Sequence, residues 1–226
     1  MTSFTFEKFI ASYPGYTDTS YLDRLRELDY KRLEREKQVY LDYTGGGLYA
    51  DSQVIKHQRM LLEGVYGNPH SSNPTSSTST ALVEDTRARV LRFFNASPED
   101  YVVIFTANAS GALKLVGEAY PFGQDCCYLL TFDNHNSVNG IREYALAKGA
   151  HVRYLPVLPP RLRAVEGKLD EYLANARGSC HNLFAFPAQS NFSSVQHPLE
   201  WIDKAHAAGW DVLLDAAAFA PTNRLD

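Results

Sequence analysis

The chain has 226 residues, of which 45% are hydrophobic, 12% aromatic and 21% charged. This composition is typical of an ordinary globular protein with one large domain, or one domain carrying an arm, and it excludes a disordered or fibrous chain. The 22 Lys and Arg against 26 Asp and Glu give a net charge of −4, and neither sign is massed in a block. A nucleic-acid partner, which needs clustered cations to neutralise phosphates, is therefore not expected.

The sequence shows neither a membrane segment nor an export signal. No apolar run approaches the roughly 18 residues of a membrane span, and charged and polar residues interrupt the apolar stretch at the N-terminus, unlike a signal peptide. The three cysteines, Cys126, Cys127 and Cys180, form neither a disulfide framework nor a CxxC metal motif. We therefore expect a cytoplasmic protein without a metal site.

Residues 1–66 are expected to form a helical arm and a glycine-rich segment, followed by a large domain over residues 67–226. The charged helix predicted over residues 20–38 has only a thin apolar stripe, typical of an arm that lies on another surface. Further helices are predicted over residues 52–65 and 80–94. The Ser, Thr, Asn and Pro residues between positions 68 and 80 favour a loop.

From residue 101 onward, apolar strand-like runs alternate five times with segments of helical spacing. Strands are predicted over residues 101–106, 127–132, 151–157, 182–186 and 212–214. Helices are predicted over residues 110–120, 136–148, 169–176 and 199–208. Short connections between alternating strands and helices predict an α/β fold with a mainly parallel sheet, flanked by helices on both faces. Cys126 and Cys127 are adjacent at one predicted strand, so they should point to opposite faces as buried, unreactive side chains.

Ligands of open parallel sheets bind beyond the carboxyl ends of the strands, so the residues at those ends are the candidates for a site. Residues 106–111 follow the first predicted strand and open directly into a helix. A helix N-terminus offers unpaired N–H groups and a positive dipole, so this turn suits a phosphate. It is equally consistent with an ordinary strand–helix turn capped by Ser110.

Other polar residues are predicted at the same edge of the sheet. His135 follows the second strand, either as a surface cap or as a plate stacking on a flat ligand, and Gln189 and Asn191 follow the fourth. Asp215 ends the fifth strand, where a carboxylate needs a cation such as a protonated ring nitrogen. Together these groups match the phosphate, ring face, phenolic oxygen and ring nitrogen of pyridoxal phosphate (PLP).

Six segments also resemble a known family: YLDYTGGGLY (40–49), YGNPHSSN (66–73), FTANASGALKLVGE (105–118), NHNSVNGIREYA (134–145), FPAQSNFSSVQHPL (186–199) and DVLLDAAAFAPTNRLD (211–226). In this order they resemble the N-terminal part of the molybdenum cofactor sulfurases, within the class V aminotransferase and cysteine desulfurase superfamily. The resemblance implies the large domain of a type I PLP-dependent transferase and a reaction that takes sulfur from L-cysteine. It is also compatible with a homodimer, because the GGG and GNPHS segments of the family lie near a dimer-related cleft.

Position by position, the resemblance implies a role for each candidate residue. Asn108, Ala109 and Ser110 would hold the cofactor phosphate. His135 would stack on the ring, Asn191 would touch the ring hydroxyl, and Asp215 would pair with the ring nitrogen. Three positions depart from the family: Asn108 stands where Gly is usual, Tyr43 where His is usual, and Ala218 where simple cysteine desulfurases carry Gln.

In the family, the lysine that forms the Schiff base with PLP follows the Asp215 motif by a further strand and turn. Residues 216–226 contain no lysine, so the resemblance implies an incomplete large domain without a catalytic residue of its own. Three hypotheses follow: an N-terminal portion of a sulfurase, a truncated PLP-binding homologue without catalysis, or a class V lyase or aminotransferase of other amino acids. A nucleotide-binding domain with Asp215 on a ribose is disfavoured, because no GxGxxG follows the first strand.

Overall fold

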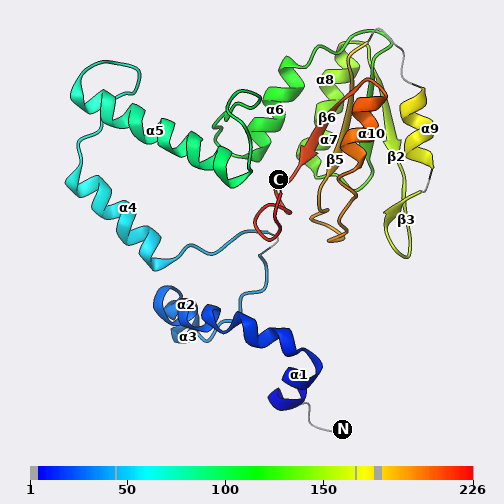
Figure 1. Cartoon of the computed structure of the whole chain (residues 1–226). Coiled ribbons are helices and arrows are strands. Elements are labelled where there is room, and N and C mark those ends of the chain that lie inside the picture. The colour runs from blue at the N-terminus through cyan, green and yellow to red at the C-terminus, as the bar shows by residue number, and fades with distance from the viewer. Residues whose placement is uncertain (1–4, 44, 166, 176–179, 226) are drawn as a thin grey trace. The chain divides into compact units, whose positions relative to one another are not determined.

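The structure is a computed structural model that describes residues 5–43, 45–165, 167–175 and 180–225 (Figure 1). Contacts within the chain separate two units, residues 1–84 and 85–226. This division falls inside a helix, α5 (Pro74–Phe93). The domain boundary expected between residues 66 and 67 stays a prediction.

The N-terminal unit is helical. Its elements are α1 (Phe6–Ser12), a 3-10 helix (Pro14–Thr19), α2 (Tyr21–Asp29), α3 (Lys31–Arg35), α4 (Asp51–Glu63) and the first part of α5. The single helix predicted over residues 20–38 is wrong, because Tyr30 leaves the helical conformation and separates α2 from α3. Arg32 then reaches the start of α4, where it pairs with Asp51 at 2.7 Å and stacks on the Tyr49 ring. This half-buried cation holds α3 against α4.

The loop predicted over residues 68–80 is wrong in its second half, because α5 begins at Pro74. The Asn73 Oδ1 accepts hydrogen bonds from the Ser76 N–H at 3.0 Å and the Thr75 hydroxyl at 2.8 Å. Asn is a favoured cap, and Pro suits the first helical position because it lacks the N–H that would go unpaired there. The composition indicated a loop, but these two residues start a helix.

The C-terminal unit is built on a parallel sheet. Its strands are β1 (Cys127–Thr131), β2 (His151–Leu155), β5 (Asn182–Pro187) and β6 (Trp210–Asp215), in the order β2-β1-β5-β6. A small antiparallel pair, β3 (Val157–Leu158) and β4 (Arg163–Ala164), follows β2. All neighbouring strands of the four-stranded sheet run parallel to one another, as the alternating pattern predicted.

The strand predicted over residues 101–106 is absent from this sheet. The segment pairs with no strand among the described residues, and Val102 is 82% exposed. Arg87 of α5 explains its placement, since its guanidinium donates to the Val103 carbonyl at 3.2 Å and lies over the Phe105 ring. β-branched residues favour an extended backbone, but a strand also needs a neighbour to accept its hydrogen bonds.

Helices cover both faces of the sheet, which confirms the expected architecture (Figure 1). One face packs against α6 (Ala109–Ala119), α7 (Asn136–Asn139) and α8 (Ile141–Ala147). The other packs against α9 (Lys168–Ala174) and α10 (Trp201–Ala207). None of the helices in the described residues is long and apolar enough to cross a lipid bilayer.

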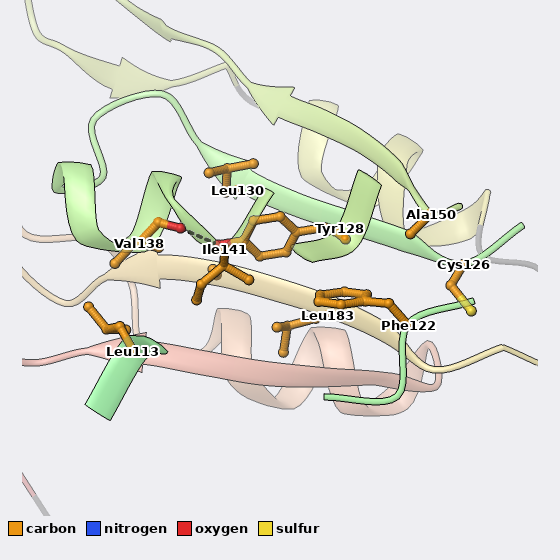
Figure 2. Packing of buried hydrophobic residues seen from close by; sticks show 11 residues of the cluster. Leu113, Phe122, Cys126, Tyr128, Leu130, Val138, Ile141, Ala150 and Leu183 are labelled. Atoms are coloured by element: carbon orange, nitrogen blue, oxygen red, sulfur yellow. Dashed lines mark hydrogen bonds between the residues drawn. The ribbon is translucent and has the colours of Figure 1, made fainter. Parts of the chain in front are cut away.

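Buried side chains between the sheet and helices α6, α7 and α8 form one core cluster. Tyr128 is its largest buried side chain and is fully buried (Figure 2). Its hydroxyl donates to the Val138 carbonyl at 2.9 Å, so this polar atom is satisfied and α7 is anchored to β1. Cys126 belongs to this cluster, whereas Cys127, which is partly buried, packs against the cluster on the α9 and α10 side of the sheet. The two side chains therefore point to opposite faces, as predicted from the alternation of side chains along a strand. Burial raises the pKa of the Cys127 thiol to about 11, so it is unreactive at neutral pH.

Candidate functional site

The carboxyl ends of β1, β5 and β6 meet at one edge of the sheet, because neighbouring strands run parallel. β1 leads into the loop that carries His135, and β5 leads into the loop that carries Asn191. Asp215 is the last residue of β6 and lies opposite Pro187 of β5 in the register. The topology thus brings three of the predicted residues to the same edge.

The start of α6 has the features of an anion site. Asn108 is extended, with φ −169°, and its side chain caps the helix by accepting the Gly111 N–H at 2.9 Å. Thr106 supports this turn by donating its hydroxyl to the Asn108 carbonyl at 2.8 Å. The first amides, those of Ala109 and Ser110, have no carbonyl within the helix to donate to, and the helix dipole is positive there. Asn108 therefore fixes the conformation of the turn, and the unpaired backbone N–H groups at this helix end are those of Ala109 and Ser110.

His135 is tied to this turn by a chain of hydrogen bonds. Its Nδ1 accepts the Ser137 backbone N–H at 3.2 Å and lies 3.1 Å from the Ser137 hydroxyl. That hydroxyl lies 2.6 Å from the hydroxyl of Ser110. Because a backbone N–H only donates, Nδ1 is the acceptor, and a neutral imidazole carries its proton on Nε2. Ser137 thus holds the exposed ring beside the N-terminus of α6.

A cavity of about 460 Å³ lies at this edge, and His135 and Asn191 both line it. Phe132 and Phe192 add apolar walls, and Leu162 closes it from the β3–β4 turn. The remaining lining residues are Asp133, Asn134, Asn136, Val157 and Ser193. Asn108, Ala109, Ser110 and Asp215 are not among the lining residues, although Ser110 is linked to the cavity through Ser137.

The Asp215 side chain is half-buried at the strand end. Its Oδ1 accepts the Ala217 N–H at 3.0 Å, which fixes the orientation of the carboxylate. Among the described residues, no hydrogen bond to Oδ2 is found. The strand end thus presents an oriented negative charge.

The lysines of residues 85–226 are engaged away from the cavity. Lys114 pairs with Glu118, Lys168 with Glu171 and Lys204 with Asp170, while Lys148 donates to the carbonyls of Glu118 and Tyr120. Within the described part of the chain, no lysine lines the cavity.

Sequence reasoning missed a buried ion pair beside the cavity. The Nε2 of His197 lies 3.0 Å from the Oδ2 of Asp133, and the two side chains are only 2% and 4% exposed. Burial raises the pKa of the Asp133 carboxyl, but the hydrogen bond and charge of His197, together with hydrogen bonds from the Thr131 side chain and the Asp133 backbone, outweigh it, so the net pKa lies below the ordinary value. The reasoning that singled out Asp215, a carboxylate at the end of an apolar strand, applies equally to Asp133.

Comparison with known proteins defines the family to which this chain belongs. The family model for class V aminotransferases matches residues 39–226, and the chain belongs to this family. The solved structures it resembles include a cysteine desulfurase from Thermococcus onnurineus, with a TM-score of 0.71, 21% identity, and coverage of 85% of this chain and 46% of that one. The cysteine desulfurase CsdA from Escherichia coli gives a TM-score of 0.68, 22% identity, and coverage of 88% and 49%. These likenesses confirm the fold.

Among named relatives, the chain is similar to molybdenum cofactor sulfurases, as the motifs indicated. It is 38% identical to that of Arabidopsis thaliana, over 97% of this chain and 29% of the relative. It is 40% identical to that of Bos taurus, over 91% of this chain and 24% of the relative. The human protein is 39% identical, over 94% and 25%. The chain thus spans about a quarter to three tenths of these relatives.

Proposed function

We propose that this chain forms the PLP-binding part of a sulfurase that takes sulfur from L-cysteine for the molybdenum cofactor. One observation carries the proposal: His135 and Asn191 line the same cavity, and Ser137 links His135 to the first turn of α6. The names of the sulfurase relatives support the reaction and its acceptor. A related structure, a C-DES variant with glycine covalently linked to its PLP cofactor, supports the cofactor.

The residues present fit this cofactor. The first amides of α6, at Ala109 and Ser110, would hold the phosphate, because helix N-termini favour anions. The ring of His135 would stack on the pyridine ring. Asn191 would meet the ring hydroxyl, and the oriented carboxylate of Asp215 would keep the ring nitrogen protonated. When bound, PLP supplies the electron sink for reactions at the amino acid.

PLP binding by the 226-residue chain tests the proposal, measured by equilibrium dialysis and by the absorbance of the bound ligand. Asp215→Ala removes a charge-assisted hydrogen bond of about 1.5–3 kcal/mol, so it should raise the Kd by about 10- to 150-fold. Asp203→Ala is the matched control, because Asp203 is exposed in the first turn of α10. Equal affinities of the two variants would show that Asp215 only ends a strand.

The substrate needs a separate test, because class V relatives act on several amino acids. The PLP-loaded chain should bind L-cysteine more tightly than L-alanine or L-serine, as measured by calorimetry. Equal affinity for the three amino acids would contradict L-cysteine as the substrate and favour a lyase or aminotransferase of another amino acid.

A further inference from the structure

The loop after β5 folds back on itself, and Asn191 lies within this turn. The Ser190 N–H donates to the Val195 carbonyl at 2.9 Å, and the His197 N–H donates to the Ala188 carbonyl at 3.1 Å. These two bonds close the base of the turn. The position of Asn191 therefore depends on what holds this base in place.

Two hydrogen bonds join this base to the loop that carries His135, and both end on Asp133. The His197 ring donates to the carboxylate at 3.0 Å. The Ser190 hydroxyl donates to the Asp133 carbonyl at 3.2 Å. Asp133 lies two residues before His135, and Ser190 lies directly before Asn191. The shortest connection between the two cavity residues thus runs through Asp133.

Stability alone is a weak explanation for this buried Asp133–His197 pair. The Asp133 side chain is only 4% exposed, and this burial works against its charged form. Buried ion pairs often contribute no more stability than apolar residues of similar size would. His197 is also held from its other side, because its ring stacks on Trp201 of α10 with 5.0 Å between centroids. Contacts on both sides of the His197 ring therefore give the pair a defined geometry.

We propose that Asp133 and His197 form a positioning pair that sets the spacing of His135 and Asn191 across the cavity, so that both address one flat ligand. This inference rests on the proposed function, in which that ligand is PLP. Neither residue of the pair is proposed to touch the reacting atoms. The pair acts through the two loops it joins.

Two variants separate positioning from stability. Asp133→Ala leaves the His197 ring buried without its partner and should lower the Tm. The double variant Asp133→Ala/His197→Phe removes both polar groups and keeps a ring against Trp201, so its Tm should return toward that of the unmodified chain. Its Kd for PLP should nevertheless stay about tenfold weaker, in the range that groups orienting a ligand contribute. Recovery of PLP affinity together with the Tm would overturn the proposal.

Trp210→Phe is the matched control. It deletes another buried hydrogen bond, from the indole Nε1 to the Leu173 carbonyl at 3.0 Å, at the opposite end of β6. It should lower the Tm without weakening PLP binding. A loss of affinity as large as that of the double variant would show that any destabilisation of this unit has the same effect, and would overturn the positioning role.

Hydrogen exchange without ligand gives a readout independent of the cofactor. In the double variant, peptides covering residues 132–139 and 188–197 should exchange faster together, while β2 remains unchanged. Unchanged exchange in either loop would overturn the coupling. If the unmodified chain binds no PLP, the proposed function fails, and the exchange data still decide whether the pair joins the two loops.

Discussion

Replacing Asn134 is the sharpest test of how the β1 loop is held. Its side-chain amide donates to the Thr131 carbonyl at 2.9 Å, the Thr131 hydroxyl at 3.0 Å and the Ala185 carbonyl at 3.1 Å. Its Oδ1 is buried without a partner, so the orientation of the amide follows from its three acceptors. The side chain joins the ends of β1 and β5 through its donors alone.

The magnitude follows from this arrangement. Asn134→Ala removes two N–H donors, and each contributes about 1 kcal/mol to the free energy of unfolding, with a further cost for the acceptors that lose their partner. It also removes the unpartnered oxygen, and this gain offsets about 1 kcal/mol of the loss. A net loss of about 2 kcal/mol is expected. Asn134→Asp has the same shape but places oxygen against three acceptors and retains the unpartnered atom. It should lose about 4 kcal/mol at pH 7, because a buried charge is added.

Urea unfolding followed by tryptophan fluorescence measures both variants. The two tryptophans of the chain, Trp201 and Trp210, lie in α10 and β6, so the signal reports the sheet unit alone. The Asn134→Asp variant should also regain stability as the pH falls, because the introduced carboxyl becomes a donor when protonated. If it is no less stable than Asn134→Ala, the amide does not act as a donor and the reasoning fails.

Three further results are expected. The pKa of Asp133 is lower in the folded chain than its ordinary value of 3.8. Its contribution to stability is therefore complete above pH 3.8 and is lost as the pH falls through the folded pKa. Melting curves between pH 7 and pH 2 should show this loss of stability, and the loss should be smaller in Asp133→Asn. Gly117→Ala should cost about 1–3 kcal/mol in thermal unfolding, because a Cβ would meet the Tyr144 ring at 2.7 Å, whereas Gly111→Ala, whose nearest neighbour lies at 3.6 Å, should be tolerated. Borohydride reduction of the PLP-loaded chain should label no single lysine completely, and mass spectrometry showing one fully modified lysine would disprove the absence of a lysine at the site.

Strands of the sheet were predictable where their residues are buried on both faces. β5 is buried along its whole length, so its sequence is continuously apolar after Asn182 and is recognised from sequence alone. The segment at residues 101–106 is also mostly apolar but has no neighbouring strand in the described part of the chain, and sequence patterns do not report neighbours. The helix predicted over residues 136–148 is divided into α7 and α8 at Gly140, whose backbone stays in the helical region with φ −60° and ψ −24°, so no cap signal in the sequence marks the division.

The candidate site was predictable only in part. The position of His135 after a strand indicated a ligand-facing residue, but its tautomer depends on Ser137, which sequence patterns treat as an ordinary cap. His197 was not recognised because its partner, Asp133, is 64 residues away along the chain. Long-range pairs of this kind follow from the sheet order, which places β5 beside β1, and not from local periodicity.

The sheet order also has a consequence for synthesis of the chain on the ribosome. β1 and β2 are neighbours joined by the short α7–α8 segment, so this half forms from local contacts, which are the fastest to assemble. β5 pairs with the other edge of β1. The Asn134 side-chain amide donates to the Ala185 carbonyl, which is synthesised 51 residues later. Until that length has emerged, one edge of β1 has no partner strand. A slow stretch of translation after residue 187 would give β5 time to pair before β6 appears.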